Sequence, residues 1–149
     1  MENKIIIIYC SSKRTGNTRY IAELMAQTLN CQAIDIATNP SINLEEYELI
    51  GLGSPIHFEG IQSKLKKWVK NIKWSNPNVC KPDVFVFTTR HLSNPNHAHN
   101  RFVNYIKKVA NLNTISSWSC RSKRVRSPET VVDLNEWIKN NIRSDKVNI

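Results

Sequence analysis

Hydroxyl and amide side chains are concentrated in one short segment near the start of the chain, which reads Ser11-Ser12-Lys13-Arg14-Thr15-Gly16-Asn17-Thr18. A helical pattern follows directly, so the segment leads into the N-terminus of a predicted helix. Backbone N–H groups there lack partners within the helix and favour an anion, and hydroxyl and amide groups add donors. These features favour a phosphate site. Its candidate residues are Ser11, Ser12, Arg14, Thr15, Gly16, Asn17 and Thr18.

The alternative interpretation of this segment is an ordinary polar turn, in which Asn17 or Thr18 caps the helix. A Walker A loop is excluded, because the pattern G-x-x-x-x-G-K-[ST] is absent. Gly16 would allow a ligand to approach the backbone closely.

A second segment that could contact a ligand, Gly53-Ser54-Pro55-Ile56-His57-Phe58-Glu59-Gly60, follows a predicted buried strand. An exposed phenylalanine at this place is costly unless a flat ligand covers it, so Phe58 is a candidate ring contact. Alternatively, Phe58 packs into the core and His57 is only solvated. The candidate binding residues of this segment are Ser54, Pro55, Ile56, His57, Phe58, Glu59 and Gly60.

The elements that must position these segments follow from hydrophobic periodicity. Apolar or alternating runs predict strands at residues 4–10, 32–36, 48–53, 83–88 and 114–119, and helical spacing predicts helices at 18–30, 61–72, 102–110 and from 127 onward. Alternating strands and helices indicate an α/β domain with a parallel sheet and helices on both faces. With no internal repeat or linker in 149 residues, we expect a single domain over residues 1–149.

Ligands of such sheets bind beyond the carboxyl ends of the strands, here after Cys10, Gly53 and Thr88. Taken together, the two segments resemble the flavodoxin superfamily. Thr15-Gly16-Asn17-Thr18 looks like its FMN phosphate loop. The run from Tyr47 to Phe58 looks like its third strand and first flavin loop. Phe85-Val86-Phe87-Thr88-Thr89 is similar to its fourth strand, and Trp118-Ser119-Cys120-Arg121 to a fifth-strand ending.

The resemblance implies a three-layer, doubly wound sandwich with a five-stranded parallel sheet in the order 2-1-3-4-5. It also implies FMN as the cofactor, and it adds Thr88, Thr89, Arg90 and His91 as second-loop candidates. The flavin would carry the chemistry, so we expect no catalytic side chain and no metal ligand. His97 and His99 do not share a helix face, and we expect solvated or capping roles for them.

Four departures from the family pattern are visible. The first loop is one residue longer, Glu59 stands where a glycine is expected after the aromatic residue, the second flavin loop lacks its glycine, and the chain is basic. A glutamate makes a peptide flip toward the flavin less easy. Arg90, with His57 and His91, would place positive charge near the ring and stabilise an anionic reduced flavin. We therefore do not expect a very low-potential carrier.

The charge is uneven along the chain. Its net value is +9, but residues 1–60 hold 4 basic and 7 acidic side chains, whereas residues 61–149 hold 17 basic and 5 acidic ones. This asymmetry favours an acidic redox-partner protein, and the alternative is a solvated face without a partner. Nucleic acid is disfavoured because no recognition motif is present. The expected docking residues are Lys64, Lys66, Lys67, Lys70, Lys73, Arg121, Lys123, Arg124 and Arg126.

Two functions remain open at this point. The first is a one-domain FMN electron carrier, and the second is a flavin-dependent oxidoreductase acting on a quinone or a tetrapyrrole. The basic charge and the long polar segment 90–100 are similar to the menaquinone-dependent protoporphyrinogen oxidases, but no counterpart of their insertion near the fifth strand is visible. The longest apolar run, residues 5–10, is too short for a membrane span. We expect a cytoplasmic protein whose four cysteines are buried, inert thiols.

Overall fold

The computed structural model describes residues 4–11, 16–38, 41–57, 60–90 and 96–142. The strands are β1 (Ile5–Tyr9), β2 (Gln32–Asp35), β3 (Leu49–His57), β4 (Gly60–Ile61), β5 (Asp83–Arg90) and β6 (Asn113–Arg121). The helices are α1 (Asn17–Leu29), α2 (Ser63–Lys70), α3 (Asn96–Ala110) and α4 (Pro128–Asn141), with short 3₁₀ turns η1 (Leu44–Glu46) and η2 (Ser122–Arg124).

Five of the strands form a parallel sheet in the order β2-β1-β3-β5-β6. This order confirms the predicted arrangement 2-1-3-4-5, since β5 and β6 are the fourth and fifth strands of that prediction. The short strand β4 is an addition that the sequence did not indicate. It pairs antiparallel with the end of β3, through Ile56 with Ile61 and His57 with Gly60.

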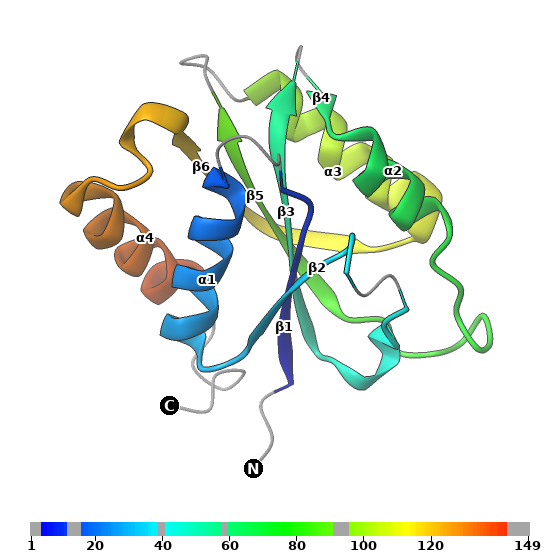
Figure 1. Cartoon of the computed structure of the whole chain (residues 1–149). Helices are drawn as coiled ribbons and strands as arrows, with labels where there is room; N and C mark the ends of the chain where they lie inside the picture. Colours follow the sequence, from blue (N-terminus) through cyan, green and yellow to red (C-terminus); the bar gives the residue numbers. More distant parts are fainter. Residues whose placement is uncertain (1–3, 12–15, 39–40, 58–59, 91–95, 143–149) are drawn as a thin grey trace.

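Helices cover both faces of the sheet, with α1 and α4 on one side and α2 and α3 on the other (Figure 1). Because side chains alternate along a strand, β1 contributes side chains to two hydrophobic cores, one on each face of the sheet. Ile5 and Ile7 join the core under α1 and α4. Ile6 and Ile8 join the core under α2 and α3. This two-sided burial explains why the strand is apolar at every position.

Two glycines of β3 make room for aromatic rings of the neighbouring strand. A Cβ atom at Gly51 would stand 2.5 Å from the ring of Phe85, and one at Gly53 would overlap the ring of Phe87. Both rings are fully buried in the core beneath α1 and α4. The sheet can therefore carry two phenylalanines in β5 only because β3 has no side chains beside them.

Several predicted boundaries were wrong. β3 continues to His57 rather than ending at Gly53, so Ser54, Pro55 and Ile56 belong to a strand and not to a loop. Pro55 is tolerated there because β1 ends opposite Gly53, which leaves β3 with a parallel partner on one side only. α2 begins at Ser63 rather than at residue 61, and α3 begins at Asn96 rather than at residue 102.

Candidate functional site

The first turn of α1 is built on a glycine in the left-handed conformation. Gly16 occupies the N-cap position with φ of 63°, and Asn17 and Thr18 are the first residues of the helix. The alternative in which Asn17 or Thr18 caps the helix is therefore wrong. A Cβ atom at Gly16 would meet no other atom within 4 Å, so the space beside this backbone is open. The N–H groups of this first turn lack acceptors within the helix.

Asn17 and Thr18 are both buried, and each is tied to a distant part of the chain. The hydroxyl groups of Thr18 and Thr89 lie 2.9 Å apart, which joins the start of α1 to the end of β5. Arg126 Nη1 donates to Asn17 Oδ1 at 2.9 Å. The guanidinium of Arg126 also lies over the ring of Tyr20, 4.8 Å from its centre. A positive charge is thus held beside the turn that was predicted to bind phosphate.

The hydroxyl of Ser54 is occupied within the protein. It is fully buried, donates to the carbonyl of Pro55 at 2.8 Å and accepts from the backbone N–H of Gln62 at 2.9 Å. The Gln62 side chain in turn accepts from the thiol of Cys10. These bonds fix the end of β3 against the start of α2. Ser54 was predicted to contact the ligand. In the structure, its hydroxyl instead bonds to backbone groups of Pro55 and Gln62.

Thr88 lies at the centre of a second buried network. Its hydroxyl donates to Ser119 Oγ at 2.9 Å and contacts Nε2 of His99 at 2.5 Å. Since the hydroxyl hydrogen goes to Ser119, the ring nitrogen of His99 donates to Thr88. Burial lowers the pKa of His99, and the positive charge of Arg90 lowers it further. The prediction of a solvated or capping role for His99 was wrong, because α3 starts early enough to turn this residue inward.

The structure brings several predicted site residues to the carboxyl edge of the sheet. Gly16, Asn17, Thr18 and Thr89 are connected there as described above, and Ser11 is half-buried directly after β1. The backbones of Ile56, His57 and Gly60 form the β3–β4 pairing at the same end. Six of the predicted site residues lie outside the described residues, and their roles stay predictions. They are Ser12, Arg14, Thr15, Phe58, Glu59 and His91.

Two hydrogen bonds of the site could not be predicted from sequence patterns. Arg126 was expected to dock a partner, yet its guanidinium bonds to Asn17, which is 109 positions away in the sequence. Gln62 and Cys10 are likewise brought together across 52 positions. No spacing rule connects residues so far apart, so only the fold reveals them.

The thiols match expectation in part. Cys10 and Cys120 are buried and Cys31 is half-buried. Cys80 is exposed, so the prediction of a buried thiol was wrong for this residue. Burial, with the charge of Asp35 adding to it, raises the pKa of Cys10 to about 11, and burial raises that of Cys31 to about 12. Such thiols stay protonated and unreactive at neutral pH. Within the described segments, no group of three His, Cys, Asp or Glu side chains is placed to hold a metal ion.

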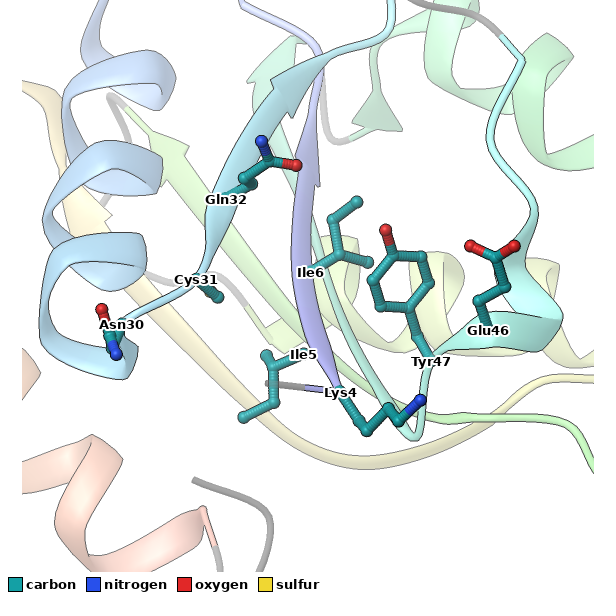
Figure 2. A pocket seen from close by; sticks show the side chains of 8 residues that line it. All are labelled: Lys4, Ile5, Ile6, Asn30, Cys31, Gln32, Glu46 and Tyr47. Carbon is teal, nitrogen blue, oxygen red and sulfur yellow. The ribbon is translucent and has the colours of Figure 1, made fainter. Parts of the chain in front are cut away.

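A further cavity lies at the other end of the sheet. Its volume is about 700 Å³, and it opens beside the amino ends of β1 and β2 (Figure 2). Tyr47 and Glu46 come from the chain before β3, and Asn30 and Cys31 from the turn after α1. Parallel α/β sheets bind ligands at the carboxyl ends of their strands, so this cavity is not the candidate site.

Comparisons with known proteins agree with this architecture. The model of the flavodoxin domain family matches residues 6–143, and the chain belongs to that family. No curated protein sequence matches the chain significantly. Among the helices described here, none is long and apolar enough to cross a membrane.

Similar solved structures share the fold at low sequence identity. The Trp repressor binding protein of Bacillus subtilis is 15% identical with a TM-score of 0.71, and the match covers 95% of this chain and 99% of that one. An NADH:FMN oxidoreductase, EmoB in its apo form, is 10% identical with a TM-score of 0.69, covering 99% and 95%. A flavoprotein from Lactobacillus acidophilus in complex with FMN is 17% identical with a TM-score of 0.58, covering 79% and 93%. The fold is flavodoxin-like.

Proposed function

We propose that this chain binds FMN at the carboxyl edge of its sheet and transfers electrons to or from a redox partner. The observation that carries the proposal is the first turn of α1, where Gly16 leaves open space beside the N–H groups and Arg126 is held against Asn17. Unpaired N–H groups, a helix dipole and a guanidinium favour a phosphate dianion at this turn. Membership of the flavodoxin domain family supports the same cofactor.

The residues present fit the phosphate end of FMN. Oδ1 of Asn17 accepts from Arg126, which leaves the amide NH₂ of Asn17 to donate outward. The bond between Thr18 and Thr89 fixes the first turn of α1 relative to β5. Bound FMN would supply the one- and two-electron chemistry, while the protein orients the ring and tunes its charge. Phe58 stays the predicted ring contact, with His57 as the rival.

The visible absorption spectrum of protein purified without added flavin tests this proposal. Flavin bands support it, and a colourless protein that also fails to quench added FMN fluorescence contradicts it. FMN should bind far more tightly than riboflavin, which lacks the phosphate. Asn17→Leu should weaken FMN binding at least about tenfold, because a bond to a charged group is worth roughly 1.5–3 kcal/mol. Gln27→Leu, on the exposed side of the same helix, is the matched control.

An acidic redox partner is the second part of the proposal. The exposed side of α2 and the residues after it hold Lys64, Lys67, Lys70 and Lys73, while Lys66 is half-buried with its ammonium 5.8 Å from the ring centre of Tyr105. The other face of α2 is buried through Leu65 and Val69. The lysines are therefore free to attract a negatively charged protein without disturbing the core. Two of the expected docking residues make other contacts: Arg121 lines a cavity, and Arg126 donates a hydrogen bond to Asn17.

A second candidate function is a flavin-dependent oxidoreductase that acts on a quinone or a tetrapyrrole. The observation that favours it is an arginine-lined cavity beside β6, at the same end of the sheet as the turn at Gly16. Turnover of such a substrate by the isolated protein would separate the two functions, because a pure carrier requires a protein partner.

A further inference from the structure

Two arginines face each other across neighbouring strands at the carboxyl edge of the sheet. Arg90 is the last residue of β5 and Arg121 is the last residue of β6, and they are direct partners in the parallel register. Both side chains are half-buried. Like charges placed opposite each other in a sheet are destabilising. Burial lowers the pKa of Arg90, and the positive charge of Arg121 lowers it further.

An irregularity in the sheet creates this pairing. The register between β5 and β6 shifts by one residue between Val84 and Phe85. Without that shift, Arg90 would lie opposite Cys120 rather than Arg121. The shift lies near the amino end of β5 and sets the pairing of every later residue of that strand, up to Arg90. The pairing of two cations is thus built into the backbone of the protein.

The two arginines line a cavity of about 660 Å³. Arg124 of η2 adds a third guanidinium to its wall, and Ser127 and Thr130 border it at the first turn of α4. Two carboxylates also reach the cavity. The remaining lining residues are Trp118, Ser119, Cys120, Glu129 and Asp133.

Two of the guanidinium groups, those of Arg121 and Arg124, are not paired with the carboxylates of this cavity. Asp133 accepts a hydrogen bond from Trp118 Nε1 at 3.1 Å. In the part of the chain that the structure describes, no ion pair joins Arg121 or Arg124 to a carboxylate. Nε of Arg121 is buried and has no hydrogen-bond partner among the described residues. A buried guanidinium donor without an acceptor is costly, so an acceptor from outside the chain would relieve it.

We propose that this cavity binds an oxyanion, a phosphate or carboxylate group of a small ligand, between Arg90, Arg121 and Arg124. Guanidinium groups bind both kinds of oxyanion through paired N–H donors. The site is distinct from the phosphate turn of α1, which Arg126 serves. Its place at the carboxyl edge suits the charged end of a molecule that exchanges electrons with a bound flavin. The binding of the oxyanion itself does not depend on FMN.

NMR titration of ¹⁵N-labelled protein with inorganic phosphate, and separately with malonate, tests this site at low ionic strength. The side-chain Nε–H signal of Arg121 should move in a saturable way, and the preferred probe distinguishes phosphate from carboxylate ligands. Arg121→Gln and Arg124→Gln should each weaken binding at least about tenfold. Lys123→Gln is the matched control, because this exposed residue lies in η2 without lining the cavity.

Thermal unfolding without ligand provides a second measurement. Arg121→Gln should leave the melting temperature unchanged or raise it, since the substitution removes one of two like charges. A clear fall in the melting temperature of Arg121→Gln would assign Arg121 a structural role and overturn the site. The site is also overturned if the Arg121 signal responds to neither probe, or if only the Asn17 and Thr18 amides move. If Lys123→Gln weakened anion binding equally, general surface charge would explain the binding, and the site would be overturned. A protein that binds phosphate here but no FMN would contradict the proposed function alone.

Discussion

Arg126 Nη1 donates a hydrogen bond of 2.9 Å to Oδ1 of Asn17, the first residue of α1. The bond crosses from the segment before α4 to the turn where the phosphate of FMN is proposed to bind. The guanidinium is further held by the ring of Tyr20, 4.8 Å from its centre. The charge of Arg126 is therefore placed by two side chains of α1 and not left to move freely on the surface.

Arg126→Gln should weaken FMN binding by about tenfold, because a bond to a charged group is worth roughly 1.5–3 kcal/mol. The salt dependence of FMN binding should fall at the same time. Riboflavin affinity should stay nearly unchanged. Fluorescence quenching across a salt series measures all three effects, with Lys123→Gln as the control for net charge. An equal loss of FMN and riboflavin affinity would mean that Arg126 acts on the fold of the site and not on the phosphate.

The bond between Thr18 and Thr89 should be visible in a double-mutant cycle. Thr18→Val or Thr89→Val alone leaves one buried hydroxyl without its partner, which costs about 1–3 kcal/mol. The double variant removes both hydroxyls and should cost less than the sum of the two single changes. Urea unfolding of the four proteins gives the coupling energy. Strict additivity would show that the contact contributes nothing to stability.

Gly53 should tolerate no side chain while Phe87 is present. Gly53→Ala forces a methyl group into the ring of Phe87 and should destabilise the protein by about 1–3 kcal/mol. Phe87→Leu in the same chain removes the overlap and should recover part of that loss relative to additivity. Chemical unfolding provides the measurement. A Gly53→Ala protein as stable as the parent would mean that the strands shift easily at this point.

His99 should make stability depend on pH in a defined direction. Burial and Arg90 lower its pKa in the folded state, so the unfolded chain takes up a proton first as pH falls below about 6.5. The contribution of neutral His99 to stability is thus present above that pH and is lost as pH falls through the lower, folded-state pKa. His99→Gln should flatten this part of the stability curve. His97→Gln, on the exposed side of α3, should leave it unchanged.

The lysines of α2 should affect association and not folding. Reversing the exposed Lys64, Lys67 and Lys70 to Glu should leave the melting temperature and bound FMN nearly unchanged, because exposed ion pairs contribute only about 0–1 kcal/mol each. Electron transfer with an acidic iron–sulfur carrier should slow by roughly 10-fold or more at low salt and lose its salt dependence. Reversing Arg101, Lys107 and Lys108, which are exposed on α3, provides the matched control. An unchanged rate across the salt series would rule out α2 as the docking surface.

Much of the architecture could be predicted from local patterns. The alternation of Ile5 to Ile8 between two faces requires two hydrophobic cores, and that requires helices on both sides of a parallel sheet. The strand order 2-1-3-4-5 was expected from the resemblance to flavodoxins and is confirmed. Boundaries were less well predicted, since β3 extends through pairing with β5 as far as Pro55 and with β4 at Ile56 and His57, and no local pattern contains these pairings.

The sequence by itself determined which segments carry hydroxyl, amide and basic groups and which strand ends they follow. Only the tertiary structure decided which of these groups meet. Thr18 contacts Thr89, 71 positions away in the sequence, and Asn17 accepts from Arg126, 109 positions away. These contacts depend on crossovers and helix packing. Arg90 faces Arg121 because the register slips by one residue within a single strand pair. Such a slip changes no residue type and no periodicity, yet it places two positive charges side by side at the edge of the sheet.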